Sequence, residues 1–320
     1  MPDEGSGASS GTPATGTVSI EVPATSANLG PGFDALGLAL GLSDRIAARF
    51  TDDEAVVVEV MGEGAGVLPD DGRNLVATVV RTGLATFDPT GELAQRGLWL
   101  QCSNDIPQSR GLGSSAAAIV GGLMLAAHLA GLAAEVSPAE LVALASRLEG
   151  HPDNVAPSVL GGATIAWMAP GPLGAVGRAV RFEVHADVVP VLAIPAGQAA
   201  TATARGALPP AVPHADAAFN AGRAALLVHA LSRDPRLLLE ATDDRLHQRQ
   251  RRVVYPASMD LVTALREQGI PAAISGAGPS VIALAGDGSG DEAAARIADV
   301  VGDSMRILRP GVAEVGVHSG

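Results

Sequence analysis

Stretches in which apolar and polar residues alternate recur along the chain and predict half-buried β-strands. Residues 17–22, 55–60 and 98–103 alternate in this way. We expect Pro23 to end the first of these strands, because proline has no N–H to donate to a sheet. The turn-forming residues that follow, 23–37, predict a loop that leads into an apolar strand. Further strands are expected at residues 36–42, 160–168, 188–194, 272–275 and 281–285, with a loop at 170–177.

Between these strands, apolar residues recur every three to four positions, which is typical of helices packed on a core. Residues 74–86 and 116–129 show this period. A further helix is expected after Ser137 and Pro138, which suit the cap and the first turn of a helix and would leave Glu149 at its end. The same period predicts helices at residues 215–231, 235–248, 259–267 and 291–301.

The interleaving of strands and helices in both halves predicts an α/β or α+β protein with two lobes. At 320 residues the chain exceeds one average domain, although a single domain is the alternative. We expect a first lobe at residues 17–182 and a second at 183–320. Residues 1–16 are small and polar, resemble neither a signal peptide nor a membrane span, and are expected to be disordered.

Charge and composition narrow the function classes. The net charge of −13 argues against nucleic acid or an anionic membrane as a partner, because both require clustered positive charge. With 47% hydrophobic but only 2% aromatic residues, the core must consist of Ala, Val, Leu and Ile. The one cysteine, Cys102, excludes an internal disulfide and fits a reducing cytoplasm. We expect it to be a buried apolar residue rather than a catalytic one.

The candidate chemistry centres on a glycine-broken turn at residues 107–116, Pro-Gln-Ser-Arg-Gly-Leu-Gly-Ser-Ser-Ala. Directly before a helix, such a turn brings together unpaired backbone N–H groups, two hydroxyls and the positive end of a helix dipole, which can hold a phosphate. The chain contains no lysine, because all 21 Lys+Arg residues are arginines, so a Walker-type P-loop and Schiff-base chemistry are excluded. A capped helix start without a ligand is the alternative explanation.

Two carboxylate-bearing segments are further candidates, each with a purely structural alternative. Ser115 and Glu149 suit a magnesium ion that takes its other ligands from phosphates and water, whereas Glu149 alone could be a solvated helix-end carboxylate. The segment His151-Pro152-Asp153-Asn154 could carry polar chemistry or could simply form a turn.

The arginines and a second glycine-rich turn complete the candidates. A guanidinium group binds a carboxylate in bidentate fashion, so Arg205 or one of Arg249, Arg251 and Arg252 could hold an acidic substrate. An exposed arginine cluster is otherwise a solvated face. The Gly-rich turn at 275–280 lies between two short apolar stretches and is equally compatible with a hairpin turn.

Taken together, these segments resemble the GHMP kinase superfamily. Its N-terminal motif corresponds to the stretch from Pro23 to Asn28, its Gly-Leu-Gly-Ser-Ser-Ala phosphate loop to residues 111–116, and its C-terminal Gly-x-Gly turn to residues 276–278. Within the superfamily the chain resembles the homoserine kinases over residues 23–37, 151–157, 201–205 and 275–280. Mevalonate-type relatives are expected to carry an active-site lysine, which this chain lacks.

The resemblance implies an α+β, two-lobed GHMP kinase fold. The N-terminal lobe would resemble domain 2 of ribosomal protein S5 and the C-terminal lobe would be ferredoxin-like, with the site between them. A closing strand near residues 312–317 would be able to return to the first lobe. The implied reaction is ATP-dependent phosphorylation of the L-homoserine side-chain hydroxyl, in cytoplasmic threonine biosynthesis, with ATP as co-substrate and Mg²⁺ as the metal.

The same resemblance assigns the nucleotide and metal contacts. Magnesium would bind Ser115 and Glu149, and Asn74 would lie near the adenine. The turn that wraps the triphosphate would comprise Pro107, Ser109, Arg110, Gly111, Leu112, Gly113, Ser114, Ser115 and Ala116.

Homoserine would be held by residues from both lobes. Asp34 suits its ammonium group and Asn154 its hydroxyl, with Asn28 beside them. Arg205 and Arg251 would clamp the carboxylate. The residues given a catalytic role are Asn154, Thr201 and Arg205, with Thr201 close to the transferred phosphate.

One segment departs from the family pattern. The family commonly has Gln-Pro-Tyr-Arg where this chain has Gln248-Arg249-Gln250-Arg251. Spacing assigns the clamp to Arg251, with Arg249 and Arg252 as the alternatives.

No strong general base is required, because the phosphoryl transition state is largely dissociative. The hydroxyl proton could pass to Thr201 or to a γ-phosphate oxygen. Two other functions stay open: a GHMP kinase for another small hydroxylated metabolite, and a non-catalytic ligand sensor on the same fold. The oligomeric state is also open, with a homodimer as one possibility.

Overall fold

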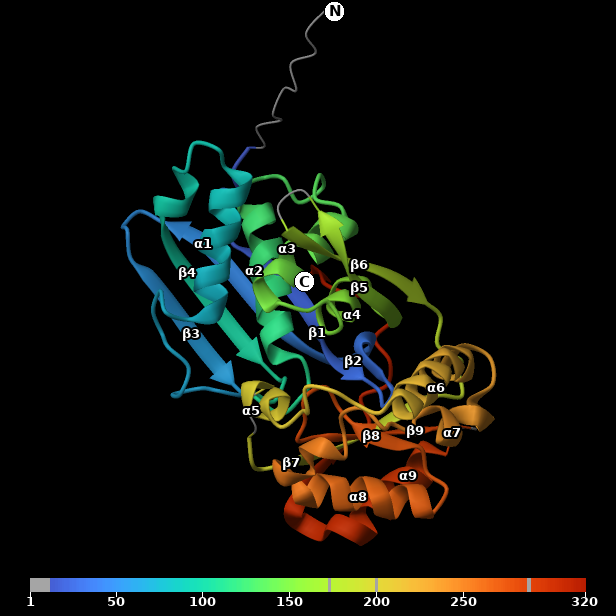
Figure 1. Ribbon diagram of the computed structural model, residues 1–320. Helices are drawn as coiled ribbons and strands as arrows, with labels where there is room; N and C mark the ends of the chain where they lie inside the picture. Colours follow the sequence, from blue (N-terminus) through green and yellow to red (C-terminus); the bar gives the residue numbers. More distant parts are fainter. Residues whose placement is uncertain (1–11, 172–173, 199–200, 287–288) are drawn as a thin grey trace, which may run out of the picture.

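The computed structural model describes residues 12–171, 174–198, 201–286 and 289–320, which form two β-sheets with helices packed on them (Figure 1). The first sheet has seven strands in the order β11-β1-β2-β4-β3, with β5 paired to β2 and β6 to β5. Only the β3–β4 pair is parallel. The mixed α+β architecture that the sequence predicts is confirmed. The strands are β1 (Val18–Asn28), β2 (Gly32–Thr51), β3 (Val56–Gly62), β4 (Gly97–Asn104), β5 (Ala163–Gly171), β6 (Gly174–Phe182) and β11 (His318–Ser319).

The first two strands form a hairpin where the sequence predicts a loop. β1 continues through Pro23 to Asn28, and β2 begins at Gly32. The pairing register shifts between Pro23 and Ala24, so the proline lies at an irregularity of the ladder, where a missing N–H is tolerated. The prediction that Pro23 ends the strand was therefore wrong. The hairpin presents residues 28–34 on a rigid tip instead of a loop.

Three helices pack on the first sheet. They are α1 (Leu75–Phe87), α2 (Ser114–Leu129) and α3 (Pro138–Glu149), all three at the predicted positions. α2 is apolar around most of its circumference, and it is buried between the sheet, α1 and α3. The short helix α4 (Val155–Leu160) was not predicted. α2 and α3 bring residues 114–115 and Glu149 to the same end of this layer.

The second sheet is antiparallel, in the order β10-β7-β9-β8. One of its faces, which carries Val191 and Ala193, packs on α8 and α9, while Leu192 and Ile194 on the other face join the core shared with α6, α7 and the first sheet. The elements are β7 (Val189–Pro195), β8 (Ala272–Ile274), β9 (Val281–Ala285), β10 (Met305–Leu308), α6 (His214–Ser232), α7 (Leu238–Ala241), α8 (Pro256–Glu267) and α9 (Gly290–Val301).

Several expected elements differ in the structure. The helix predicted at 235–248 ends at Ala241, because Asp244 accepts hydrogen bonds from the N–H groups of Leu246, His247 and Gln248 and fixes a non-helical turn. Much of the loop predicted at 170–177 belongs to the β5–β6 hairpin. The segment before Arg205 is a helix, α5 (Thr201–Gly206). Short 3₁₀ turns are η1 (Leu93–Gln95), η2 (Pro235–Leu237), η3 (Gln250–Val253) and η4 (Gly302–Ser304).

The C-terminal segment leaves the second sheet and runs back along the first (Figure 1). Val312 bridges Leu40, the Gly162 N–H donates to Ala313 O, and β11 pairs with β1. The segment near 312–317 does return to the first sheet, as the sequence predicts, but it makes isolated hydrogen bonds, and the strand itself follows at His318–Ser319.

The N-terminal extension is described only from residue 12 onward. Residues 1–11 of the extension expected to be disordered lie outside the described residues, while the Ala14 N–H donates to Leu129 O at the end of α2. Within the described ranges, we find no helix with both the length and the apolar character required to cross a bilayer.

Candidate active site

The glycine turn and the start of α2 form one wall of a cleft. Gly111 and Gly113 have φ of 73° and 72°, and a side chain at either position would collide with Ser275 O or with Thr25. The first N–H of α2 with an acceptor inside the helix is that of Ala117, bonded to Gly113 O at 2.8 Å. The amides of residues 114–116 are therefore available to an anion, as expected from the sequence.

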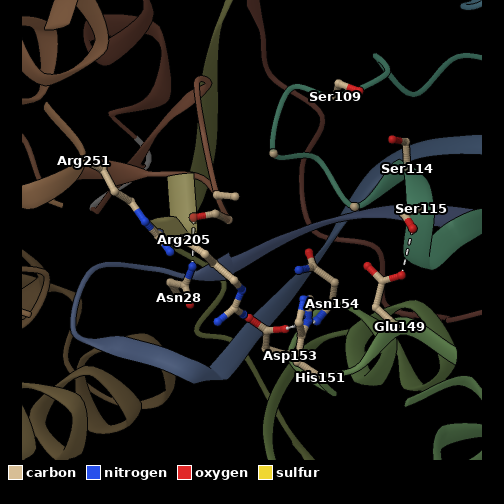
Figure 2. Close-up of a pocket in the computed structure, with 14 residues that line it drawn as sticks. Asn28, Ser109, Ser114, Ser115, Glu149, His151, Asp153, Asn154, Arg205 and Arg251 are labelled. Carbon is tan, nitrogen blue, oxygen red and sulfur yellow. Dashed lines mark hydrogen bonds and ion pairs between the residues drawn. The ribbon is translucent and has the colours of Figure 1, made fainter. Parts of the chain in front are cut away.

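Side chains from elements around both sheets line this cleft. Figure 2 shows Ser115 and Glu149 on one side, with Arg205 and Arg251 reaching in from another. The Gly-rich turn at 275–280, which joins β8 to β9 as a hairpin, closes the cleft through Gly276. The lining residues are Asn28, Ser109, Gly111, Gly113, Ser114, Ser115, Glu149, His151, Asp153, Asn154, Arg205, Arg251, Gly276 and Ala277.

Ser115 and Glu149 are in direct contact, as their proposed common role requires. The Ser115 hydroxyl donates to Glu149 Oε2 at 2.7 Å. Burial raises the pKa of the Glu149 carboxyl, and the bond from Ser115 only partly opposes this rise. A partly desolvated carboxylate of this kind gains from a nearby cation. The described residues contain no cluster of three or more His, Cys, Asp or Glu side chains able to hold a metal by themselves.

Asp34 and Arg205 are brought together, but they bind each other. Two guanidinium nitrogens of Arg205 donate to the two carboxylate oxygens of Asp34 at 3.0 and 2.7 Å. Hydrogen bonding to Asp34 raises the pKa of Arg205. Both side chains keep 36% of their surface exposed; Arg205 lines the cleft, whereas Asp34 is not among the lining residues and adjoins the cleft through this pair.

Arg251 is the inward-pointing arginine of its cluster. It is 1% exposed, whereas Arg249 and Arg252 are exposed and lie outside the cleft. Its Nε donates to Ala204 O at 3.1 Å, and its Nη1 donates to Nδ1 of His247 at 3.1 Å. Burial lowers the pKa of the Arg251 guanidinium. Of the three alternatives that the sequence leaves open, only Arg251 is therefore placed to hold a ligand in the cleft.

A stacked aromatic pair supports the two arginines. The Phe33 ring lies 4.9 Å from the His247 ring, with the guanidinium carbons of Arg205 and Arg251 at 5.6 and 5.3 Å from its centroid. The His247 Nε2–H donates to Gly30 O at 2.7 Å, and burial lowers the pKa of this imidazole. The sequence analysis gave neither Phe33 nor His247 a role, and no local motif marks this contact.

The segment after α3 contributes an ion pair and an amide. Nδ1 of His151 lies 2.9 Å from Asp153 Oδ1, and this hydrogen bond raises the pKa of His151. Asn154 lies at the start of α4, where its Oδ1 accepts from the Thr25 hydroxyl at 2.9 Å. Asp153 is 2% exposed and was not assigned a role from sequence.

Asn28 lies in the cleft wall as a brace. Its Nδ2 donates to Gly276 O at 2.8 Å, while its Oδ1 accepts from the Asp34 N–H at 2.9 Å. These bonds tie the β1–β2 hairpin tip to the glycine turn of the second sheet. The substrate contact expected of Asn28 would have to compete with them.

Some predicted nucleotide residues lie apart from this cleft. Arg110 donates to Pro195 O at 3.0 Å, to Ala196 O at 2.7 Å and to Gln108 O at 3.0 Å. Its guanidinium thus ties the turn to the end of β7. Pro107, Leu112 and Ala116 are buried and do not line the cleft, and the side chain of Thr201 lies outside the described residues.

A second cavity, of about 180 Å³, adjoins the cleft across the same turn. The two share Ser109, Ser114 and Ser115. Asn74 lines this second cavity, although its side chain is occupied: Oδ1 accepts from the Val76 N–H and Nδ2 donates to Pro69 O. The other lining residues are Asp44, Ile46, Leu68, Pro69, Leu75, Val76, Cys102, Asn104, Gln108 and Ala118.

Family models match both halves of the chain. The model described as "GHMP kinases N terminal domain" matches residues 74–162, and "GHMP kinases C terminal" matches residues 223–305. Together the two matches cover the glycine turn, Glu149, Asn154 and Arg251.

Proteins named homoserine kinase are similar over most of the chain. The one from Streptomyces avermitilis is 52% identical over 278 residues, covering 87% of this chain and 88% of that protein. The one from Mycolicibacterium vanbaalenii is 50% identical, covering 84% of each.

Solved structures give the same picture of the fold. The crystal structure of homoserine kinase from Cytophaga hutchinsonii superimposes with a TM-score of 0.82 at 26% identity, over 97% of this chain and 99% of that one. A mevalonate kinase structure has a TM-score of 0.63 at 13% identity, over 92% and 99% of the chains, and shows a shared fold only.

Proposed function

We propose that this chain, which belongs to the homoserine kinases of the GHMP kinase family, transfers the terminal phosphoryl group of ATP to the side-chain hydroxyl of L-homoserine. The products are ADP and O-phospho-L-homoserine. The observation that carries the proposal is that Arg205, which is paired with Asp34, lines the same cleft as the glycine turn. The Asp34 carboxylate and the guanidinium groups of Arg205 and Arg251 can bind the two charged groups of an amino acid. The backbone amides of the glycine turn can bind a phosphate beside it.

The charges of the cleft match those of a zwitterionic substrate. Arg205 and Arg251 hold the carboxylate, because a guanidinium binds a carboxylate through two parallel hydrogen bonds. Asp34 accepts from the ammonium group. Homoserine inserts between Asp34 and Arg205 and replaces each partner with a group of equal charge, so neither is left unpaired. Asn154 orients the hydroxyl toward the turn.

ATP occupies both hollows that meet at the turn. Its phosphates lie on the amides of residues 111–116, and its base enters the second cavity, which shares Ser109, Ser114 and Ser115 with the cleft. Arg110 does not line the cleft; its guanidinium group holds the turn against the end of β7. Asn74 borders the base but uses its own polar groups to cap α1.

The metal site fits a magnesium ion that is bound mainly by the nucleotide. A hard cation needs oxygen ligands and retains water and phosphate oxygens. Ser115 and Glu149 offer a hydroxyl and a partly desolvated carboxylate 2.7 Å apart. When bound, the ion neutralises charge that develops on the transferred group.

Alignment and charge neutralisation supply most of the rate. The transition state is largely dissociative, so the protein has to hold the hydroxyl in line with the phosphate more than it has to remove a proton. Thr201 opens α5, which also carries Arg205, and we assign it a place near the transferred phosphate. The two lobes, residues 17–182 and 183–320, supply the phosphate and the carboxylate contacts respectively.

We assign the reaction to threonine biosynthesis in the cytoplasm. A phosphate ester converts the poorly leaving hydroxyl of homoserine into a good leaving group, which is what a later elimination requires. The single cysteine, buried and unpaired, is compatible with a reducing compartment.

A coupled ADP-release assay tests the proposal. L-homoserine should drive turnover in the presence of Mg²⁺, whereas L-homoserinol, which lacks the carboxylate, and N-acetyl-L-homoserine, which lacks the ammonium, should lose roughly 100-fold or more in kcat/KM because each leaves a charge unpaired. Comparable turnover of either analogue, or ADP release that is independent of homoserine, would refute the assignment.

A further inference from the structure

Asp44 is a buried carboxylate in the wall of the second cavity. It lies in β2, is 5% exposed and faces surroundings that are mostly apolar, such as Ile46, Leu68 and Val76. The family resemblance gave this residue no role, and its sequence context carries no motif. A carboxylate in such a place requires hydrogen-bond partners.

Only one of its two oxygens has partners. Oδ1 accepts from the N–H groups of Asp105 at 2.8 Å and Ile106 at 2.9 Å. Across the described parts of the chain, the hydrogen bonds to this carboxylate reach Oδ1 alone, and no ion pair involves it. Burial raises the pKa of Asp44 to about 7; the two amide bonds oppose the rise, and the neighbouring Asp105 and Glu63 add to it. The second oxygen is not among the buried unpartnered atoms of the described residues, so it stays accessible, and because Asp44 lines the second cavity it is an acceptor open to a ligand there.

We propose that this free oxygen of Asp44 accepts a hydrogen bond from the exocyclic amine of adenine, so that Asp44 selects 6-aminopurine nucleotides over 6-oxopurine ones. The inference rests on the proposed function, because it requires the base of ATP to enter the second cavity. Asn74, the polar residue expected at the base, has both of its side-chain groups engaged with Val76 and Pro69.

The selection follows from what each base presents to an acceptor. An adenine amine donates to the carboxylate and offsets part of its desolvation. At a pH above the pKa of Asp44, where the side chain is a carboxylate, the 6-oxo group of hypoxanthine in the same place sets an acceptor against an acceptor and leaves both unsatisfied. Sites built around a specific hydrogen bond discriminate more strongly than sites that recognise shape alone.

The substitution Asp44→Asn tests the inference, because the local hydrogen bonds fix how the new amide is oriented. The two N–H donors at Asp105 and Ile106 require an oxygen at the Oδ1 place. The carboxamide NH₂ then takes the place of Oδ2, and an acceptor facing the cavity becomes a donor. The ratio of kcat/KM for ATP to kcat/KM for ITP should fall by about tenfold or more, at an unchanged KM for homoserine.

Asp105→Asn is the matched control. Asp105 is an exposed neighbour that does not line the cavity, so its substitution removes a charge close to the same turn without changing the acceptor. Its ATP/ITP ratio should equal that of the wild type. Should both nucleotides lose the same factor in Asp44→Asn, Asp44 would only brace the turn and the inference would be wrong.

If the Asp44→Asn variant does not fold, nucleotide binding to the wild-type protein tests the same inference. Purine riboside triphosphate, which lacks the 6-amine, should bind about tenfold more weakly than ATP in calorimetry. Equal affinity would overturn the inference while leaving the kinase assignment intact. By contrast, absence of homoserine-dependent turnover with every nucleotide would refute the proposed function itself.

Discussion

Glu149 lines the cleft, whereas Asp34 adjoins it through its pair with Arg205, so the two carboxylates have different partners. Asp34 is paired with a guanidinium group, whereas Glu149 accepts a hydrogen bond from the Ser115 hydroxyl and has a pKa raised by burial, which Ser115 and the charge of His151 oppose only in part. In the Asp34–Arg205 pair the two charges neutralise each other until a charged substrate enters. The Glu149 carboxylate has no ion pair among the described residues, which is the physical reason to propose the metal at Glu149.

Replacing Glu149 should therefore act mainly on magnesium. Glu149→Gln keeps the size and the acceptor for Ser115 but removes the charge, so the Mg²⁺ concentration for half-maximal activity should rise roughly tenfold and kcat should fall. Kinetics across a magnesium titration measure both. Glu267→Gln, at the exposed end of α8, is the matched helix-end control. An unchanged magnesium dependence would remove Glu149 from the metal site.

His151 gives the cleft a pH-dependent contribution to stability. Its folded-state pKa is raised by the bond to Asp153, so the stabilisation is present in full below the ordinary value of about 6.5 and is lost as pH rises through the higher folded value. Asp153→Asn should therefore lower the free energy of unfolding more at pH 5.5 than at pH 9. Urea denaturation at both pH values measures this, and an equal loss at each would contradict the charged pair.

At the scale of single residues, the sequence predicts which residues lie at the cleft but not which side chains pair or where they point. Glu149, Asn154, Arg205 and Arg251 all line the cleft, as their motifs indicate. That Asp34 and Arg205 pair across 171 positions of sequence, and that Arg110 points away, depends on side-chain directions set by tertiary packing. Spacing along a chain carries no information on those directions.

Among the elements, α3 shows how far local sequence can determine structure. Ser137 caps the helix by accepting from the Glu140 N–H, and the Glu140 side chain bonds back to the Ser137 N–H in a capping box. The predicted helix start is therefore confirmed. The other end of the same helix delivers Glu149 to the cleft.

This division of labour along α3 can be tested. Ser137→Ala should lower the free energy of unfolding by about 1 kcal/mol, because the Glu140 N–H loses its acceptor at the cap and the Glu140 carboxylate loses the bond from the Ser137 hydroxyl. KM for homoserine and the magnesium dependence should not change, since the cap lies at the opposite end from Glu149. Denaturation and kinetics on one preparation give both values. A shifted magnesium dependence would mean that the helix end does not hold Glu149 independently of its start.

The elements missed from sequence have one common cause. Local propensity predicts that Pro23 ends a strand and that residues 235–248 form one helix, but it contains no information on distant partners. In the folded chain, a shift of the ladder accommodates the proline, and Asp244 takes up the N–H groups that a helix would need. Both outcomes depend on partners distant in sequence or on side-chain bonds that periodicity does not reveal.

On the scale of the whole molecule, the cleft is assembled from elements of both sheets. The phosphate turn belongs to the layer of α2, while Arg205, Arg251 and Gly276 come from the chain around the second sheet. The fold class could be predicted from interleaved strands and helices, and the family from its motifs. The return of the C-terminus to β1 required the structure for its register, because two residues of strand carry too short a pattern.

Arg110 links the glycine turn to the chain after β7, and this link between the two sheets can be tested by substitution. Its guanidinium joins the phosphate turn to Pro195 and Ala196 beyond β7, so Arg110→Ala should displace the turn relative to the substrate arginines. We expect kcat to fall by about tenfold to 100-fold with little change in the thermal midpoint. Arg306→Ala, which breaks an exposed pair with Glu63, is the control. A fall in stability without a kinetic effect would show that Arg110 has only a structural role.

The identity of the phosphorylated product tests the central claim most directly. Phosphorus NMR of the protein with ATP, Mg²⁺ and L-homoserine should show a new phosphomonoester signal that grows in step with ADP and belongs to O-phospho-L-homoserine. Mevalonate or a sugar in place of homoserine should give no ester at a comparable rate. A phosphorylated mevalonate or sugar, or ADP formed with inorganic phosphate alone, would contradict the account.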